Sequence, residues 1–177
     1  MKYTNPNIES SYRSHDLGKT LYDLVLKLKP KKIIEFGTLN GYSAICMAMA
    51  LDELKEGKII SYDLWEAYKF NKGNKASVRE LIEAMDLQGY ISLQTGDFNH
   101  WIPEPFDLFH LDISNDGEKI KKLADKTKDN GTVIFEGGTS ERDHALWMSK
   151  FNKMPISASG VKYRVINADF PSISMLI

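Results

Sequence analysis

Segments with helical spacing alternate along the chain with short apolar runs. Apolar residues recur at helical intervals over residues 17–28, with Ser14 as the expected N-cap and Pro30 as the stop. The run Lys31–Phe36 ends at a glycine and is typical of a strand buried on both faces. The segment Tyr42–Leu54 is apolar almost all round, which predicts a helix packed deep against that sheet.

The same alternation continues towards the end of the chain. Further strands are expected at Lys58–Asp63, Ile91–Thr95, Phe106–Ile113 and Thr132–Glu136. Further helices are expected over about Asn74–Leu87 with Gly89 near the C-cap, over Gly117–Lys128, and from a capping box at Ser140 and Asp143 to about Asn152. The last two β-like runs, Val161–Asn167 and Ser172–Ile177, are too close together for a crossover helix and should pair as a hairpin.

Alternating strands and helices predict an α/β fold, a doubly wound and mostly parallel sheet with helices on both faces. The terminal hairpin adds an antiparallel strand. We find no internal repeat or linker, so we expect a single domain over residues 1–177, with a helical segment of about residues 1–30 packed on its core. Ligands of such sheets bind at the carboxyl ends of the strands, near the switch in strand order.

Composition narrows the class of partner. The 177 residues carry 23 basic and 24 acidic side chains, and a net charge of −1 argues against nucleic acid or an anionic membrane as the main partner. No uncharged apolar stretch approaches the roughly 18 residues of a membrane span, and the first residues contain no apolar signal segment. The single cysteine, Cys46, lies among apolar residues and is expected to be packing. We therefore expect a cytoplasmic protein.

The first strand runs into a glycine turn over residues 35–43, Glu-Phe-Gly-Thr-Leu-Asn-Gly-Tyr-Ser. Gly37 permits a tight turn, and Gly41 at the helix entry lets a ligand approach the backbone closely. The spacing is neither the G-x-G-x-x-G of dinucleotide enzymes nor a P-loop. Because Glu35 would repel a pyrophosphate, the turn suits a ligand that presents a cation or a hydrogen-bond donor.

Acidic residues also follow the other parallel strands. Asp63 ends the second strand, where a carboxylate can accept two hydrogen bonds from a ribose diol. Asp97, in Gly96-Asp97-Phe98 after the third strand, can accept a hydrogen bond from an amine, or it caps the next turn. Asp112 and Glu136 end the fourth and fifth strands.

At these residues the sequence resembles the class I S-adenosylmethionine-dependent methyltransferases, most of all the small O-methyltransferases of the methyltransferase domain 24 and cephalosporin-hydroxylase-like group. The resemblance runs from about Ser14 to Ile177 and implies the strand order 3-2-1-4-5-7-6. It implies S-adenosylmethionine as cofactor, with the methionine portion at the glycine turn, the ribose at Asp63 and the adenine at Asp97 and Phe98. The cofactor-binding residues that it implies are Glu35, Gly37, Thr38, Asn40, Gly41, Tyr42, Ser43, Asp63, Leu64, Gly96, Asp97, Phe98 and Asp112.

The resemblance implies methyl transfer to a small-molecule acceptor at oxygen. A non-catalytic module or subunit that binds S-adenosylmethionine is the alternative, because so short a chain leaves few residues to cover the acceptor. A nucleotide-binding oxidoreductase is disfavoured by the missing G-x-G. The apolar hairpin offers an edge or face to a second copy, so self-association as a homodimer is expected.

Whether the protein depends on a metal ion is decided by the roles of Asp112 and Glu136. Metal-dependent O-methyltransferases place acids at these strand ends to hold Mg²⁺ together with two oxygens of a catechol-like acceptor. Gly137 stands where an Asn or Asp ligand is expected, so we favour no metal, or a weak site completed by water and substrate. In the alternative interpretation Asp112 contacts the amino acid end of the cofactor and Glu136 holds a loop.

The remaining candidates are histidines and aromatic residues. His144 follows the fifth strand and, with Asp112, is a candidate catalytic residue; a solvated helical histidine is the alternative. His110 is expected to be a hydrogen-bonded core histidine. Three aromatic residues after Asp63 either wall the adenine or form a loop flap: Trp65, Tyr68 and Phe70.

Overall fold

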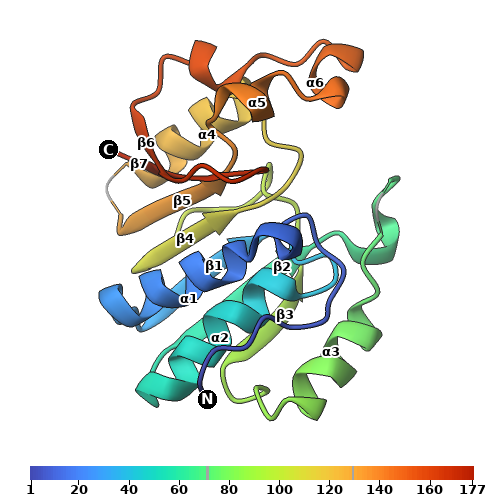
Figure 1. Ribbon diagram of the computed structural model, residues 1–177, viewed down its shortest axis with the longest axis vertical. Helices are drawn as coiled ribbons and strands as arrows, with labels where there is room; N and C mark the ends of the chain where they lie inside the picture. Colours follow the sequence, from blue (N-terminus) through green and yellow to red (C-terminus); the bar gives the residue numbers. More distant parts are fainter. Residues whose placement is uncertain (71, 129) are drawn as a thin grey trace.

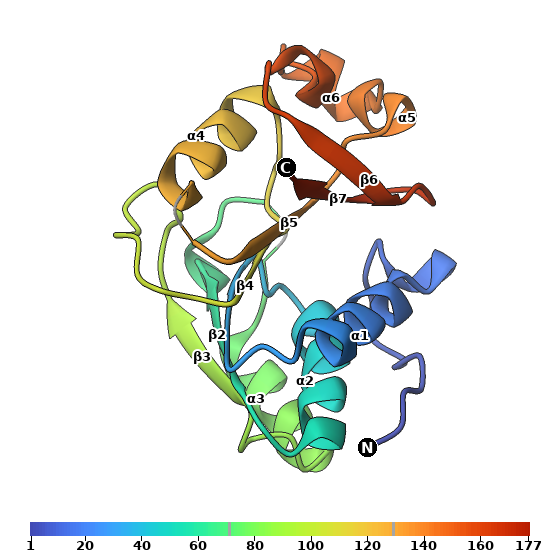
Figure 2. The ribbon, with the colours of Figure 1, turned by 90° about the vertical axis from the view of Figure 1, so that its left-hand side faces the viewer.

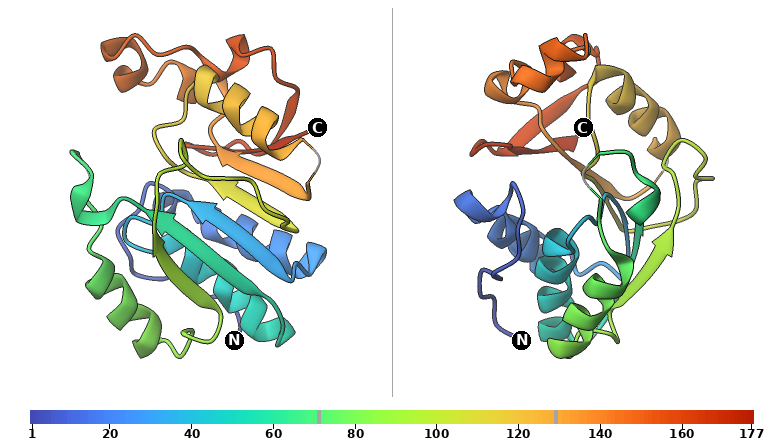
Figure 3. Two further views of the ribbon diagram at one scale, coloured as in Figure 1. Left: turned by 180° about the vertical axis from the view of Figure 1, so that it is seen from behind. Right: turned by 90° about the vertical axis from the view of Figure 1, so that its right-hand side faces the viewer.

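The computed structural model describes residues 1–70, 72–128 and 130–177, and these form a seven-stranded sheet in the order β3-β2-β1-β4-β5-β7-β6 (Figure 1). The predicted strand order is confirmed. The strands are β1 (Lys32–Phe36), β2 (Lys58–Asp63), β3 (Ile91–Thr95), β4 (Leu108–Leu111), β5 (Thr132–Glu136), β6 (Tyr163–Asn167) and β7 (Ile173–Leu176). The first five strands are parallel to one another, and β7 is antiparallel to both β5 and β6. Strands β3 and β6 therefore form the two edges of the sheet (Figure 3).

Helices cover both faces of the sheet, as Figure 2 shows for α4 on one side and α1 and α2 on the other. The helices are α1 (Leu17–Leu28), α2 (Tyr42–Leu54), α3 (Lys75–Ala84), α4 (Gly117–Thr127), α5 (Ser140–Asp143) and α6 (Leu146–Lys150). Short 3₁₀ helices are η1 (Arg13–His15), η2 (Trp65–Ala67) and η3 (Ile156–Ala158). No helix in the described part of the chain is long and apolar enough to cross a membrane.

Two apolar cores result, one on each face. The first joins α1, α2 and α3 to the sheet through buried residues such as Leu21, Met47 and Ile82. The second joins α4 to an aromatic group that contains Phe36 and Phe109. The burial of Cys46 in the first core confirms its predicted packing role.

Several helix ends differ from the predicted ones because side-chain caps decide them. The helix expected from Asn74 to Leu87 starts after Asn74, whose side chain accepts a hydrogen bond from the Ser77 amide at 2.9 Å, and ends at Ala84. The prediction of Ser14 as an N-cap is wrong: Ser14 lies within η1, and Asp16 in the left-handed region (φ 52°) precedes α1.

The region after β5 also departs from the prediction. Thr139 caps α5 by accepting from the Arg142 amide, so the expected capping box at Ser140 is wrong. The single helix expected to about Asn152 is two short helices that break at residues 144–145. Residues 96–107 between β3 and β4 contain no helix, so the strict alternation of strand and helix fails there.

The N-terminal segment crosses the carboxyl ends of the central strands. Ile8 and Tyr12 are buried in the same core as α1 and α2, and the Tyr42 hydroxyl donates to Asn5 Oδ1 at 2.8 Å. The Asn40 side-chain amide donates to a backbone carbonyl of the same segment at 3.2 Å. Residues 5–12 are thereby fixed beside the edge of the sheet where ligands of this fold class bind.

Candidate functional site

The turn between β1 and α2 has a backbone conformation that favours glycine at two positions. Gly37 (φ +100°) and Gly41 (φ +87°) both have left-handed backbones, and a Cβ on Gly37 would lie 1.6 Å from the carbonyl oxygen of Asp112. Leu39 also has a positive φ, 45°, at the position where dinucleotide-binding turns carry glycine. The Leu39 amide donates to Asp63 Oδ2 at 2.8 Å, which joins the turn to the end of β2.

Asp63 is partly exposed at the end of β2 and is oriented by backbone donors. Its Oδ2 accepts from the Leu39 amide and its Oδ1 from the Trp65 amide at 2.7 Å. Because each carboxylate oxygen has two lone pairs, both oxygens retain capacity for one more donor. The arrangement is suited to a ligand with two adjacent hydroxyls. Leu64 next to it is also partly exposed.

The three aromatic residues after Asp63 lie in different surroundings. Trp65 is buried, and its Nε1 donates to the Gln94 carbonyl at 2.9 Å. Tyr68 instead hydrogen-bonds Ser114 after β4 at 3.1 Å, and exposed Phe70 meets Phe151 edge-on. Tyr68 and Phe70 thus lie on a flap, residues 66–70, that reaches from β2 towards β4 and α6.

The turn after β3 contributes one carboxylate and no exposed ring. Asp97 Oδ1 caps the turn by accepting from the Asn99 amide at 2.8 Å and from its side chain at 3.0 Å, while Oδ2 has only His100 at 3.6 Å. The Phe98 ring is 2% exposed and packs edge-on against Phe36, so in this arrangement its face is not available to a base. A Cβ on Gly96 would lie 2.8 Å from the Tyr62 ring.

Glu35 organises the turn from below. The carboxylate is fully buried and accepts hydrogen bonds from Ser43 Oγ at 2.6 Å and Ser61 Oγ at 2.5 Å, and it lies 3.0 Å from His110 Nδ1. The Ser61 hydroxyl also pairs with Thr38 at 2.6 Å. Because protein groups occupy both oxygens, Glu35 positions the turn and does not itself face a ligand here.

His110 is buried between Glu35 and Tyr12. Its Nε2 lies 3.2 Å from the Tyr12 hydroxyl, and the Tyr12 side chain is fully buried. The prediction of a hydrogen-bonded core histidine is confirmed. The chain Tyr12–His110–Glu35 ties the N-terminal segment to the sheet.

Asp112 lies directly after β4, next to this chain. Its amide donates to the Phe36 carbonyl at 2.8 Å, and the residue is partly exposed. Burial, reinforced by the negative charges of Glu136 and Glu35, raises the pKa of Asp112 to about 7. A carboxyl group with this pKa is divided between its acid and base forms near neutral pH.

Glu136 is buried at the end of β5 and pairs with Arg142. The Arg142 Nε and Nη2 donate to the two carboxylate oxygens, Nη2 to Oε2 at 2.8 Å. Burial raises the pKa of Glu136, and the guanidinium opposes that rise. Sequence reasoning missed Arg142, although a buried acid requires a partner and Arg142 is the basic residue in the next helix.

The donor set at these strand ends does not fit a divalent cation. Arg142 takes both oxygens of Glu136, and Gly137 offers no ligand. Within the described residues there is no group of three or more His, Cys, Asp or Glu side chains arranged to hold a metal ion.

His144 is exposed at the end of α5. Its Nδ1 lies 2.7 Å from the Ser140 carbonyl, and hydrogen bonds within the described residues do not connect it to Asp112. This geometry corresponds to the solvated helical histidine of the alternative interpretation.

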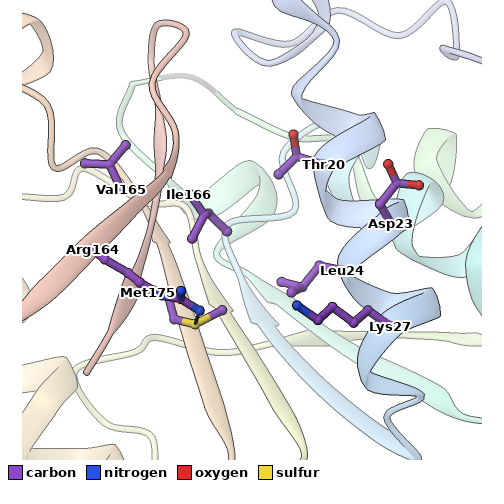
Figure 4. Close-up of a pocket in the computed structure, with 8 residues that line it drawn as sticks. All are labelled: Thr20, Asp23, Leu24, Lys27, Arg164, Val165, Ile166 and Met175. Atoms are coloured by element: carbon purple, nitrogen blue, oxygen red, sulfur yellow. Dashed lines mark hydrogen bonds between the residues drawn. The ribbon is translucent and has the colours of Figure 1, made fainter.

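A groove of about 500 Å³ lies elsewhere, between α1 and the hairpin β6–β7 (Figure 4). Leu24, Ile166 and Met175 line it together with the charged Asp23, Lys27 and Arg164. None of the strand-end acids lines this groove. We therefore place the chemistry at the strand ends, where the carboxylates and the glycine turn meet.

Comparison of the sequence with models of known protein families identifies the family of this protein. Residues 34–136, which contain the glycine turn and all four strand-end acids after it, match the model of the Methyltransf_24 family, described as a methyltransferase domain. The chain belongs to this methyltransferase family. The predicted resemblance is confirmed.

Known methyltransferases resemble it in sequence and fold. A catechol O-methyltransferase of Niastella koreensis is 30% identical over 148 residues, which cover 71% of this chain and 62% of that protein. The chain thus matches less than two thirds of that relative's length.

Solved methyltransferase structures share the fold at lower identity. An O-methyltransferase from Bacillus cereus solved with SAH is 19% identical with a TM-score of 0.64, covering 98% of this chain and 84% of that one. The SAH-bound methyltransferase PaMTH1 of Podospora anserina is 18% identical with a TM-score of 0.66, covering 95% and 79%. The O-methyltransferase TomG of Streptomyces achromogenes, solved with SAM, is 19% identical with a TM-score of 0.58, covering 94% and 86%.

Proposed function

We propose that this protein transfers a methyl group from S-adenosylmethionine to a hydroxyl of a small-molecule acceptor. The observation that carries the proposal is Asp63, held by backbone amides at the end of β2 beside the family's glycine turn, with spare lone pairs on both oxygens. The cofactors named for the Bacillus, Podospora and Streptomyces relatives and the catechol O-methyltransferase activity of the Niastella relative support it.

The cofactor half of the site fits S-adenosylmethionine in its chemistry. Gly37 and Gly41 leave the backbone open to close approach, Asp63 offers acceptors to the ribose diol, and Asp97 Oδ2 offers one to the adenine amine. Glu35 supports the turn through Ser43. When bound, the cofactor supplies an electrophilic methyl group on a sulfonium that already carries its leaving group.

Asp112 is the proposed base. Transfer to a hydroxyl requires that its proton be removed, and a base is most effective when its pKa lies near the working pH. Burial raises the pKa of Asp112 to about 7, which meets that condition. The catalytic role predicted for His144 has no geometric support, since that side chain is exposed and turned to its own helix.

Calorimetry and a transfer assay test the proposal together. We expect S-adenosylhomocysteine to bind and NAD not to bind, and we expect labelled methyl from S-adenosylmethionine to appear on a hydroxyl of catechol or a related phenol. Failure to bind S-adenosylhomocysteine would remove the cofactor assignment. Binding without transfer to any of a panel of phenols and alcohols would favour the non-catalytic module.

A homodimer through the hairpin is the proposed assembly. Strand β6 is an edge of the sheet, and Val165 on it is 40% exposed, as Phe170 at the hairpin turn is 37% exposed. Unpaired edge strands with apolar side chains favour pairing with a second chain. Light scattering at micromolar concentration should give twice the chain mass, and a strict monomer would overturn this assembly.

A further inference from the structure

Arg142 and Glu136 form a buried, bidentate ion pair at the carboxyl end of β5. Arg142 is 3% exposed and Glu136 5% exposed, and Nε and Nη2 of the arginine face the two carboxylate oxygens. Bidentate pairs of this kind fix orientation as well as charge. A guanidinium therefore occupies the place beside the β5 acid where a divalent cation would need carboxylate oxygens.

Gly137 has a packing role that explains why the ligand expected there is missing. Its backbone is left-handed (φ +106°), and a Cβ would lie 2.7 Å from Ile156 Cδ1 and 3.4 Å from Arg142 Cγ. An Asn or Asp at this position would have a strained backbone, and its Cβ would clash with Ile156. The backbone conformation and this packing therefore require glycine at position 137.

The helix that carries Arg142 is fixed at a second point. Asp143 accepts from the Ile156 amide at 2.7 Å and from the Ser157 amide at 3.0 Å, and the Trp147 ring centroid lies 4.5 Å from Arg142 Cζ. The guanidinium is therefore held from three directions, as a positioned catalytic cation must be.

Two buried polar atoms in this cluster have no hydrogen-bond partner among the described residues. They are Arg142 Nη1 and Asn115 Oδ1. The orientation of the Asn115 amide is fixed, because its Nδ2 donates to the carbonyls of Leu111 and Glu136, both at 2.9 Å. Arg142 Nη2 also donates to the Asn115 carbonyl at 3.3 Å, so the two residues are neighbours.

Buried polar atoms are nearly always paired in folded proteins, so two orphans in one cluster indicate a ligand. One is a donor and the other an acceptor, which matches a hydroxyl group in both of its hydrogen-bonding roles. Glu136 already neutralises Arg142, and Asp112 adds a further carboxylate, so the local charge favours a neutral ligand over an anion.

Resting on the proposed function, we propose that Arg142 takes the place of a divalent cation in the acceptor site. Nη1 donates to the oxygen of a neutral, hydroxyl-bearing acceptor, and Asn115 Oδ1 accepts from a hydroxyl of the same molecule. As the acceptor O–H bond breaks, its proton forms a bond to the Asp112 carboxylate, and the electron pair left on oxygen is stabilised by Nη1. No metal ion takes part in binding the acceptor.

Manganese binding tests the cation position without any acceptor. Titration of the wild-type protein with Mn²⁺, followed by electron paramagnetic resonance, should give no site that depends on Glu136. In Arg142→Gln the freed Glu136 and Asp112 should bind Mn²⁺ at least tenfold more tightly than in the wild type. Equal Mn²⁺ affinity in the two proteins would overturn the proposal.

Kinetics test the role in catalysis. With catechol as probe acceptor, wild-type transfer should be unchanged within twofold in a chelator. Arg142→Lys keeps the charge but loses the bidentate pairing with Glu136 and the Nη1 donor. We therefore expect kcat/KM to fall about 100-fold or more. The affinity for S-adenosylhomocysteine should stay within twofold, and Arg164→Lys, the same change on an exposed arginine, is the matched control.

A double variant distinguishes loss of catalysis from loss of folding. Arg142→Gln/Glu136→Gln removes both charges, so the buried pair leaves no uncompensated partner. We expect it to fold, to bind S-adenosylhomocysteine and to lose transfer. Full activity of this variant or of Arg142→Lys, or wild-type activity lost in chelator and restored by Mg²⁺, would overturn the inference. Absence of S-adenosylhomocysteine binding by the wild type would instead contradict the proposed function.

Discussion

The two halves of the strand-end edge hold their carboxylates differently. On the β2–β3 side, backbone amides orient Asp63 and Asp97, and both side chains are partly exposed. On the β4–β5 side, Glu136 is buried against a charged side chain and Asp112 lies next to that cluster. The first half is suited to binding a ligand of fixed shape, and the second to moving a proton.

The difference has an energetic basis. A carboxylate that accepts hydrogen bonds from amides and stays partly in contact with water needs no charged partner residue. A carboxylate shielded from water needs a counter-charge or a proton. Removal of a charge on the β4–β5 side should therefore change stability and rate, whereas removal of a carboxylate on the β2–β3 side should change ligand affinity.

Removal of Arg142 should have the largest effect on stability. In Arg142→Met the buried Glu136 carboxylate loses its partner, and breaking such a pair costs about 3–5 kcal/mol. Urea unfolding at pH 8 should show this loss, and Arg142→Met/Glu136→Leu should recover most of it. A single variant as stable as the wild type would mean that the β5 carboxylate is not held as a buried charge.

Replacement of Asp112 should have the next largest effect, on rate. Asp112→Asn keeps the shape but cannot take a proton, and loss of a general base costs about 100-fold or more in kcat. Wild-type activity should rise with pH through about 7 as Asp112 loses its proton. The variant should lose this limb of the profile, while binding of S-adenosylhomocysteine changes little. A wild-type limb retained in the variant would assign the titration to another group.

Asp63→Ala should weaken S-adenosylhomocysteine binding. Each hydrogen bond from a ribose hydroxyl to a charged acceptor is worth about 1.5–3 kcal/mol, so the loss should be roughly tenfold or more by calorimetry. Asp23→Ala, which removes an exposed carboxylate on α1, is the control. Unchanged affinity in Asp63→Ala would mean that Asp63 does not bind the cofactor, and the proposed division of roles between the two halves would then be wrong.

Stability should also depend on pH in a way that separates the halves. The pKa of Asp112 is raised on folding, so between about pH 4 and 7 the folded state binds a proton that the unfolded state lacks. The stability penalty is therefore absent below about pH 4, grows as pH rises from about 4 to 7, and is complete above pH 7. Asp112→Asn should be more stable than the wild type at pH 8 by up to about 4 kcal/mol, since each tenfold change in proton affinity is worth roughly 1.4 kcal/mol and a pKa raised from 3.8 to about 7 is about three such changes. Near pH 4 the difference should vanish, and a difference independent of pH would contradict the raised pKa.

The sequence was most informative where structure is local. Strands β2, β3 and β5 and helix α2 have the predicted bounds, because alternation and apolar runs depend on neighbours in the chain. The strand-end position of Asp63 follows from the same pattern. The strand ends at which we propose that the cofactor binds could therefore be located from the sequence.

The acceptor half could not be predicted because its contacts depend on how separate elements meet. The left-handed backbones of Gly137 and Gly138 turn the chain so that Arg142 returns to Glu136, and no periodicity indicates that return. Phe98 could equally face a base or the core by its pattern. Only its packing on Phe36 decides between them.

The smallest predicted effect concerns Gly73, which lies after the flap and against the glycine turn. A Cβ on Gly73 would lie 2.4 Å from the Leu39 carbonyl oxygen, so Gly73→Ala must move residues 72–74 away from the glycine turn. The cost should be about 1 kcal/mol, the low end for overpacking, because a surface loop can shift. Gly89→Ala is the matched control, since a Cβ there meets nothing within 4 Å, and that variant should be neutral or slightly stabilised. Because Leu39 also donates to Asp63, the Gly73 variant should bind S-adenosylhomocysteine a few-fold more weakly and the Gly89 variant normally. Equal affinities for S-adenosylhomocysteine in the two variants would mean that the position of Gly73 does not affect cofactor binding. The glycine turn and Asp63 would then form the whole of the proposed cofactor site.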